Sequence, residues 1–513
     1  MSASRDKEKR KAEREQGLDM RNAREKDAER KQRRNRRLTM AGCALFLIAA
    51  AFVLFVNSNF FYRDIAAVTI NGERYSILEY NYFYQTAYSD FYNNNYGYYY
   101  IDSSKPLDEQ SYPYGDEEQA GWTWADYFRD QAITNMRQVT MLLAAAAEND
   151  VVALDEEHQA VLDENLAYYE ASAAYYSYTT DAYLAASYGQ GMTAALFTDI
   201  MERVLLADQY AGQVRDEIKA GYTDEALEAY YVEKQDEFDR FTYRVYLAES
   251  MEDEEASIDA ETGMNEAKEI ADAIAAAGDE EELEALILEY GGEDAASSLY
   301  EGTMGSDVSS IYSEYILDAD RQPGDISVIE STGGYYVVYF ISRDSNEVET
   351  VNVRHILIEA EAVETEDDAT DEEVAAAKAE ADAAALEQAE VLLAEWEDGE
   401  ATEDSFAALA EEYSADAGSN ENGGLYENVY PGKMVTTFND WCFDPVRVAG
   451  DTGIVQSDYG YHILYFSGHT GQTYRAYLAE QSLLYEDYTA WIAETTAAYT
   501  AKASALPMLF VTK

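Results

Sequence analysis

The segment from Leu425 to Phe466 reads LYENVYPGKMVTTFNDWCFDPVRVAGDTGIVQSDYGYHILYF, and a version of it occurs earlier in the chain. Leu299 to Phe340 aligns with it at an offset of 126 positions without a gap, and 12 of the 42 pairs are identical. A segment repeated in this way is one supersecondary unit used twice. The sequence therefore predicts two small α+β domains in tandem, at 239–345 (the first repeat) and 350–468 (the second repeat).

The two repeats share their frame but differ in polar residues. Each reads as strand, helix, glycine-rich loop, helix and closing strand. The second repeat carries His355 in RHILI and His462 in YGYHILY, with Asp416 between them in YSAD. At the matching positions the first repeat holds Val245 for His355, Glu293 for Asp416 and Tyr336 for His462, and it has Val308 and Tyr312 where the second repeat has Met434 and Phe438. Residues that only hold the fold would persist in both repeats, so we expect a functional site in the second repeat and a degenerate first repeat.

The second repeat contains several short motifs whose order along the sequence resembles that of a known protein family. Its RHIL opening, its YS-x-D segment, its double glycine Gly423-Gly424, its G-x-M-x-x-x-F at 432–438 and its closing YGYHI resemble a parvulin-type peptidyl-prolyl cis/trans isomerase. The resemblance implies a pair of histidines under the substrate, an acidic residue facing the isomerising bond, a hydroxyl near the closing strand and an apolar wall for the proline ring. The residues at these positions are His355, His462, Asp416, Ser457, Met434 and Phe438.

One position departs from the family pattern. Many parvulins follow the double glycine with Asp-Leu-Gly, whereas this chain has Leu425-Tyr426-Glu427. Tyr426 then takes a substrate-pocket position that is commonly leucine, so we expect an altered substrate preference or rate, and a loss of isomerase activity stays open.

The chemistry that the resemblance implies suits these residue types. Rotation about an X-Pro bond is slow because amide resonance must be broken, at a cost of roughly 18–20 kcal/mol, and lowering that barrier needs no covalent step. An apolar pocket can fix the ring and exclude water, and a polar network can favour the twisted amide. We expect no cofactor. The two cysteines, Cys43 and Cys442, lie too far apart in the sequence to suggest a disulfide framework or a Cys-based zinc site.

The charge of the chain changes sign at a membrane signal. The formal net charge is −65, yet residues 1–37 carry +7 and the rest −72. Leu38 to Val56 contains no charge, and a helix of that length nearly covers a hydrocarbon core of ~30 Å. The positive-inside rule then predicts a cytoplasmic tail at 1–37, a transmembrane helix at 38–57 and an exported body in a single-pass membrane protein. A cleaved signal peptide and a lipid-modified Cys43 are the alternatives.

The exported part before the repeats reads as a mostly helical, chaperone-like domain at 64–238. An Asn71-Gly72 hairpin turn precedes a capping box formed by Ser76 and Glu79. Tyrosines then recur every four residues and form a stripe on one helix face, which indicates core packing or, alternatively, a surface that grips unfolded chains. This stripe comprises Tyr80, Tyr84, Tyr88, Tyr92 and Tyr96. After the repeats, 473–506 is again amphipathic, and we expect a C-terminal helix that packs on this domain.

Charge and domain order narrow the function. The acidic body is a poor partner for nucleic acid and favours basic, unfolded clients. Residues 359–373 hold 9 acidic residues, so phosphorylated substrates should be repelled. The arrangement resembles PrsA/SurA-like extracytoplasmic foldases of Gram-positive bacteria. It implies a membrane-anchored isomerase and chaperone that assists exported proteins containing X-Pro bonds. A catalytically inactive holdase is the alternative. A surface adhesin or scaffold is a third class of function, but we find no adhesive repeat or wall-anchoring tail in the sequence that would support it.

Overall fold

The structure is a computed structural model that describes residues 2–94, 97, 100–117, 119–251, 259–292, 294–361 and 370–512. Within it the chain divides into two compact units. The helical unit comprises residues 1–217 and 488–513, and the repeat unit comprises residues 218–487. Tyr96 of the predicted stripe, Glu293 and most of the acidic 359–373 segment lie outside the described residues.

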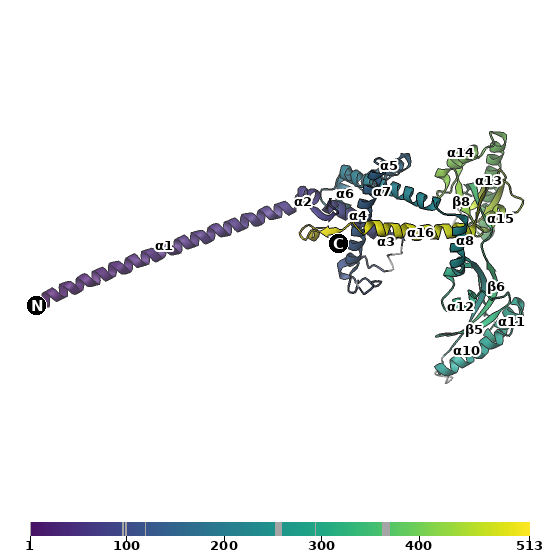
Figure 1. The fold of residues 1–513 in the computed structure, drawn as a ribbon, viewed down its shortest axis with the longest axis horizontal. Helices are drawn as coiled ribbons and strands as arrows, with labels where there is room; N and C mark the ends of the chain where they lie inside the picture. The colour runs from purple at the N-terminus through teal and green to yellow at the C-terminus, as the bar shows by residue number, and fades with distance from the viewer. Residues whose placement is uncertain are drawn as a thin grey trace. The chain divides into compact units, whose positions relative to one another are not determined.

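The chain begins with one continuous helix, α1 (Ser2–Val56), which includes both the basic tail and the apolar segment (Figure 1). This is the one helix, among the described residues, that is long and apolar enough to cross a membrane by length and composition. Side chains of its apolar window are almost entirely exposed. An apolar surface of this length left unburied by the protein is typical of a membrane anchor or a signal sequence.

The core of the helical unit begins directly at the end of α1. Val56 is 5% exposed and Phe61, in α2 (Asn59–Asp64), is fully buried in the same apolar cluster. The Ser58 hydroxyl caps α2 by accepting a hydrogen bond from the Phe61 amide. The folded part of this unit therefore starts before residue 64, where the sequence placed the domain boundary.

A hairpin follows, and its turn has the predicted geometry. Strands β1 (Ala66–Ile70) and β2 (Glu73–Ser76) pair antiparallel. Asn71 and Gly72 join them with φ values of 47° and 96°, the left-handed conformation that a two-residue turn of this kind requires. The predicted capping box is confirmed, since the Ser76 amide donates to Glu79 Oε2 over 2.7 Å and the Glu79 amide donates to Ser76 Oγ over 3.2 Å.

The tyrosine stripe lies inside the helical unit. Tyr80 and Tyr84 of α3 (Ile77–Asn94) are at most 2% exposed, and Tyr84 and Tyr88 make edge-on ring contacts with Phe128 of α4 (Trp124–Glu148). The core-packing interpretation is therefore confirmed for Tyr80, Tyr84 and Tyr88, which belong to the apolar cluster or pack against it. Tyr92 is half-buried and stacks on Tyr88. The remaining helices are α5 (Glu156–Tyr175), α6 (Thr180–Tyr188) and α7 (Ala194–Ala220).

The C-terminal segment joins the sheet of the helical unit. After α16 (Tyr474–Thr496), the short strand β11 (Ala501–Ala503) pairs antiparallel with β1. Arg137 donates to the carbonyl oxygens of Tyr499 and Thr496 over 2.8 and 3.1 Å. These contacts occupy carbonyl groups at the helix end, and the helix stops at Thr496 instead of continuing to residue 506 as expected.

The repeat unit contains two four-stranded sheets of the same topology. Their strand orders are β4-β3-β6-β5 and β8-β7-β10-β9, and all strand pairs are antiparallel. The first sheet consists of β3 (Arg240–Glu249), β4 (Ser298–Met304), β5 (Ile326–Ser331) and β6 (Gly334–Asp344). The second consists of β7 (Glu349–Ile358), β8 (Leu425–Val429), β9 (Thr452–Ser457) and β10 (Gly460–Thr473).

Pairing registers in the two sheets match the sequence offset. Ser331 pairs with Gly334 in the first sheet, and Ser457 pairs with Gly460 in the second. The helices of the first repeat are α10 (Ala260–Ile274), α11 (Glu280–Gly291) and α12 (Ser313–Ile316); those of the second are α13 (Asp371–Asp398), α14 (Glu403–Tyr413) and α15 (Thr436–Cys442) (Figure 1). Helices α8 (Asp224–Glu233) and α9 (Gln235–Phe238) precede them, and the Thr223 side chain caps α8 by accepting a hydrogen bond from the Ala226 amide.

Candidate functional site

The strand register brings the two histidines of the second repeat together. His355 of β7 pairs with Leu464 of β10, and His462 stands two residues from Leu464 on the same strand, hence on the same face of the sheet. The two Nδ1 atoms lie 3.2 Å apart. Both residues are buried, with His355 3% and His462 5% exposed. The rings are nearly parallel, with centroids 5.4 Å apart.

Asp416 is the acceptor around which the polar groups converge. Its Oδ2 atom lies 2.7 Å from His355 Nε2 and accepts hydrogen bonds from Ser419 Oγ over 2.5 Å and Tyr426 Oη over 2.9 Å. Its Oδ1 atom accepts from the Gly418 amide over 3.1 Å. The carboxylate sits in the turn that follows α14, at the edge of the second sheet. The structure thus places Asp416 and Tyr426 with His355, as the resemblance implied.

The hydrogen-bond geometry fixes one arrangement of protons along the network. An ionised Asp416 can only accept, so His355 must carry its proton on Nε2. A neutral His355 then accepts at Nδ1, so His462 donates from Nδ1 and accepts at Nε2. Ser457 Oγ, 2.7 Å from that atom, donates to it and itself accepts the Tyr459 amide hydrogen bond over 3.1 Å. Each donor in this series of hydrogen bonds points toward Asp416, which is the final acceptor of the network.

Burial and hydrogen bonding hold this charge arrangement in place. Burial, together with the neighbouring His355, lowers the pKa of His462 to about 4. Burial also lowers the pKa of His355, although Asp416 opposes the shift. Burial alone would raise the pKa of Asp416, but hydrogen bonds from Ser419, His355 and Tyr426 outweigh it and hold that pKa well below its usual range. At neutral pH the site therefore consists of two neutral imidazoles and one carboxylate.

An apolar wall covers one side of the histidine pair. Phe438 of α15 is 1% exposed, and its ring meets His355 and His462 edge-on with both centroids at 5.5 Å. Met434, half-buried, packs in the same cluster. Tyr426 also lies against His355, at a centroid distance of 5.3 Å. Helix α15, the loop before it and strand β8 thus place Phe438, Met434 and Tyr426, respectively, beside the histidine pair.

The double glycine is required by close backbone packing beneath the site. Gly424 has φ +71°, and its carbonyl accepts the His355 amide hydrogen bond over 2.8 Å. A Cβ atom at Gly424 would lie 2.1 Å from the His355 carbonyl oxygen. The glycine therefore lets the turn after α14, which carries Asp416 and Ser419, approach the strand that carries His355.

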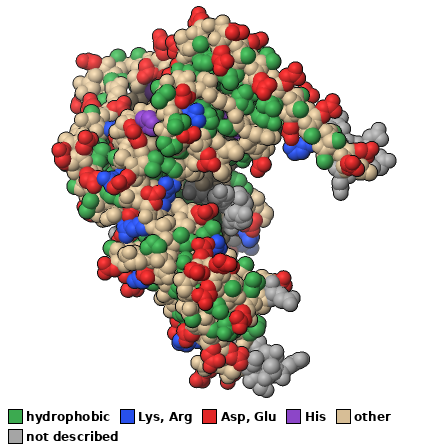
Figure 2. All heavy atoms as spheres, turned by 90° about the vertical axis from the view of Figure 1, so that its right-hand side faces the viewer, with side chains coloured by type: hydrophobic (Ala, Val, Ile, Leu, Met, Phe, Trp, Pro, Cys, Tyr) green, Lys and Arg blue, Asp and Glu red, His purple; other side chains and the backbone are tan. Residues whose placement is uncertain are grey.

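A groove opens beside the Ser457 end of the network. It runs between the end of β7, helix α13, the start of α15 and the β9–β10 turn, and Ser457 itself lines it. Its charged side chains are Glu359, Glu361, Asp382, Asp458 and Lys378, and Lys378 is itself paired with Asp382 over 3.2 Å. Figure 2 shows acidic side chains widely spread over the visible face of the molecule. The surroundings of the site thus favour positive charge.

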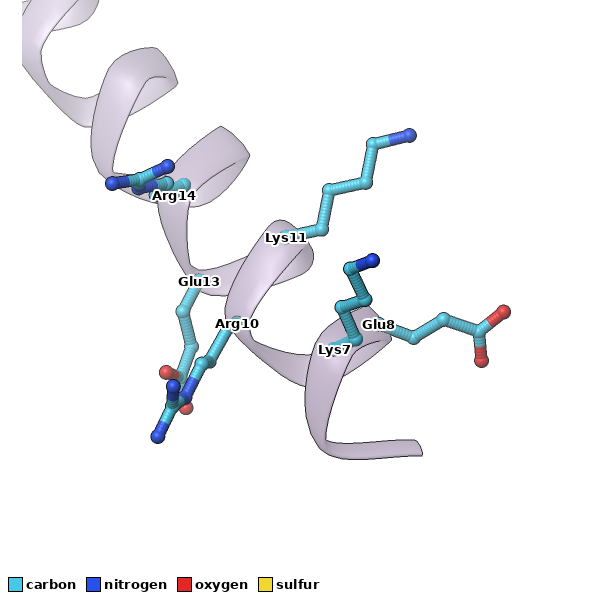
Figure 3. A pocket seen from close by; sticks show the side chains of 6 residues that line it. All are labelled: Lys7, Glu8, Arg10, Lys11, Glu13 and Arg14. Carbon is cyan, nitrogen blue, oxygen red and sulfur yellow. The ribbon is translucent and has the colours of Figure 1, made fainter. Parts of the chain in front are cut away.

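A second hollow, near the N-terminus, carries no such chemistry. It is formed by Lys7, Glu8, Arg10, Lys11, Glu13 and Arg14. These side chains project from a single helix, α1 (Figure 3). All six are exposed, so the space between them is open to solvent and is no binding cavity.

The first repeat holds tyrosines where the second holds its network. Val245 pairs with Val338 just as His355 pairs with Leu464, so the registers are equivalent. Tyr312 and Tyr336, the counterparts of Phe438 and His462, contact each other edge-on with centroids 5.8 Å apart. Tyr243 stacks on Tyr300 at 4.9 Å, and Tyr312 also contacts Tyr243. Aromatic packing has replaced the polar site.

Sequence reasoning missed Ser419. Its side chain is 2% exposed and contacts both Asp416 and His355 Nε2, the latter over 3.1 Å. The signal that could have found it is its position three residues after Asp416, in a stretch rich in turn-forming residues, where a short hydroxyl side chain can reach back to a carboxylate.

Comparison with known families agrees with this geometry. Residues 339–469 match the family model of the PPIC-type PPIase domain. This chain carries a parvulin-type, PPIC-type PPIase domain. The match includes all the residues of the His355, Asp416 and His462 network.

Similar proteins cover limited parts of the chain. Foldase protein PrsA of Geobacillus sp. (strain WCH70) is 44% identical over 61 residues, 12% of this chain and 22% of the relative. Chaperone SurA of Alkalilimnicola ehrlichii is 31% identical over 179 residues, 33% of this chain and 36% of the relative. The chain thus spans about a fifth to a third of the length of the curated relatives it matches. The crystal structure of PrsA from Bacillus subtilis covers 76% of this chain and 91% of its own, with 12% identity and a TM-score of 0.27.

Proposed function

We propose that this protein is a membrane-anchored, extracytoplasmic peptidyl-prolyl cis/trans isomerase and chaperone that assists the folding of exported proteins. The observation that carries the proposal is the buried network of His355, His462 and Asp416 beneath Phe438, inside a PPIC-type domain. A single carboxylate, held ionised next to an apolar wall, is an arrangement suited to binding a proline ring and stabilising a twisted amide.

The geometry supports a division of labour without a covalent step. Met434 is partly exposed and packs against the buried Phe438, so it offers an apolar surface against which a proline ring can pack, and such a surface excludes water from the X-Pro bond. The carboxylate of Asp416 is pre-oriented by three donors, so it does not reorganise as the amide twists. The two histidines act as positioning residues, because each ring uses both its nitrogens within the network and none is left for proton transfer to a substrate.

Topology supports the extracytoplasmic placement. Residues 1–37 carry +7, and the uncharged segment that follows begins directly after Arg36 and Arg37. By the positive-inside rule the tail stays in the cytoplasm, and the chain after the uncharged segment, with the folded parts of both units, lies on the far side of the membrane. The proposal treats α1 as an uncleaved anchor. The direct packing of Val56 into the folded core supports this, because the anchor and the domain share one cluster.

Unfolded polypeptides are the clients that this proposal names. The helical unit exposes a group of tyrosines around the end of α5 and the loop that follows it, namely Tyr168, Tyr175, Tyr176 and Tyr178, each more than half exposed. Exposed rings of this kind offer apolar contact area together with a polar tip. The acidic groove beside Ser457 supports a preference for basic over phosphorylated segments, since carboxylates there would repel phosphate.

One observation favours a second candidate, a holdase without isomerase activity. Tyr426 of β8 donates a hydrogen bond to Asp416 Oδ2 and so takes up part of the acceptor capacity of the carboxylate. A substrate amide would then have to share or displace that bond. In this case the second repeat would only bind clients.

A proline-peptide assay coupled to proteolysis separates the two candidates. The full chain in detergent micelles is used, because a fragment starting at residue 64 would lack the buried Phe61. An isomerase accelerates the cis-to-trans step of the peptide over buffer, with a Lys-Pro peptide favoured over a phosphoserine-Pro peptide. No acceleration by the wild-type protein, together with suppressed aggregation of an unfolded client, would establish the holdase instead.

A further inference from the structure

The loop that carries the apolar wall is held by a residue from the first repeat. Residues 430–435 connect β8 to α15, contain Met434 and lead into Phe438. Arg240, the first residue of β3, donates from Nη1 to the Pro431 carbonyl oxygen over 2.5 Å. The donor and acceptor are 191 positions apart, and both lie in the repeat unit.

The Arg240 side chain is held by its own partners in the repeat unit, so it can fix the position of the loop that it binds. Its Nε atom donates to Asn346 Oδ1 over 2.7 Å, and Asp344 lies 3.6 Å from Nη2. Asn346 is fully buried with φ 55°, and its side-chain Nδ2 donates to the Phe238 carbonyl over 2.7 Å. The side chain of Arg240 is 14% exposed. A planar guanidinium held at two edges in this way is a rigid support.

The loop 430–435 lies close to Arg240 and is connected to the helix that carries Phe438. Gly432 has φ +89°, and a Cβ atom there would lie 3.5 Å from Arg240 Nη1, so the arginine passes close to the loop apex. The Gly432 amide donates to Asn439 of α15, which couples the apex to the helix that carries Phe438. Tyr430 stacks on Tyr474 with centroids 3.9 Å apart, and the Arg240 guanidinium lies over the same Tyr474 ring at 5.6 Å.

We propose that Arg240 is a positioning residue for the isomerase site, through which the first repeat holds the substrate-binding loop 430–435 of the second. This inference rests on the proposed function for its kinetic readout. It gives the first repeat a role although that repeat lacks the polar network: it supplies a fixed donor to the loop. The carbonyl of Pro431, tied to Arg240, holds in place the loop that contains Met434 and leads into the helix that carries Phe438.

Arg244 offers a matched control on the same strand. Its side chain is 20% exposed and bonds Glu280 Oε1 over 2.6 Å and Ser297 Oγ over 3.2 Å, partners that both belong to the first repeat. Replacing either arginine by alanine removes one partly buried guanidinium from β3. Only the Arg240 replacement frees the loop.

The test compares Arg240→Ala, Arg244→Ala and Arg240→Lys in the full chain. We expect Arg240→Ala to raise KM for a proline peptide about 5- to 10-fold with kcat nearly unchanged. Arg244→Ala should stay within 2-fold of wild type, and Arg240→Lys, which keeps one donor, should recover part of the loss. Hydrogen exchange at residues 430–435 should rise in Arg240→Ala and stay at the wild-type rate in Arg244→Ala.

The two readouts separate this inference from the proposed function. If the wild-type protein showed no isomerase activity, the proposed function would fail, while faster exchange confined to 430–435 in Arg240→Ala would still support the positioning role. Unchanged exchange in that loop would overturn the inference, whatever the kinetics. Equal effects of Arg240→Ala and Arg244→Ala on both KM and exchange would also overturn it, because they would indicate a general loss of stability.

Discussion

The two repeats share one sheet topology but carry different side chains on it, a polar network in the second repeat and packed tyrosines in the first. In the second, His355 and His462 sit under Phe438 and lead to one carboxylate; in the first, the positions of His462 and Phe438 are taken by Tyr336 and Tyr312. Strand order and register are the same in both. The difference shows that the polar network is not needed to hold this fold, because aromatic packing can fill the same space.

The largest effect that sharpens this comparison is expected at Asp416. Replacing it with alanine leaves His355, Ser419 and Tyr426 without their shared acceptor, and we expect kcat/KM for a proline peptide to fall roughly 100-fold, as when one preorganised electrostatic contact is removed from a catalytic site. In the first repeat, Tyr336→Phe removes a hydroxyl and should leave kcat/KM unchanged. Comparable losses in the two variants would contradict the assignment of the site to the second repeat.

A stability effect of middle size is expected at the double glycine. Gly424→Ala places a Cβ atom against the His355 carbonyl and forces alanine to φ +71°, which costs about 1–3 kcal/mol for the backbone strain alone. Ser298, the matching residue of the first repeat, is exposed at the start of β4, so Ser298→Ala should change stability by less than about 0.5 kcal/mol. Urea unfolding measures both, and a Gly424→Ala protein as stable as wild type would show that the close approach is wrong.

A further effect is expected on the pH dependence of stability. His462 is neutral in the folded protein, with a pKa of about 4, whereas an unfolded histidine titrates near 6.5. The folded state therefore binds fewer protons between these values, and its stability, fully present above pH 6.5, should decline as pH falls toward 4. Asp416, with its lowered pKa, continues the loss below about pH 4. Replacing His462 with phenylalanine should flatten the decline between pH 6.5 and 4 in urea unfolding; an unchanged slope would contradict the neutral pair.

Local patterns predicted much of the fold. The Asn71-Gly72 turn and the Ser76–Glu79 capping box depend on neighbouring residues, and the structure has both. The internal repeat, read at an offset of 126, also predicted equivalent strands, because the pairing of a strand follows from its alternation of side chains. The end of α16 was missed, because Arg137, more than 350 positions away, binds the carbonyls there.

The part of the candidate site that could be predicted is the part that follows from the motifs of the family resemblance. The motif order indicated His355, Asp416 and His462, and their distances agree with a single network. Ser419 was missed although its spacing from Asp416 is a local signal, whereas Arg240 was not predictable, since it acts through a contact that only the folded chain creates. Arg240 in particular lies outside the motif region and reaches the loop through a register that no local pattern encodes.

The central claim is that a proline-isomerase site lies in the second repeat and not in the first. Its most direct test is the protease-coupled proline-peptide assay on the full chain in micelles, with wild type, His462→Ala and the matched Tyr336→Ala measured side by side. We expect acceleration by the wild type and by Tyr336→Ala, and a loss of most of it in His462→Ala. Acceleration that survives in His462→Ala but disappears in Tyr336→Ala would contradict a site in the second repeat, as would a wild-type protein that matches buffer alone.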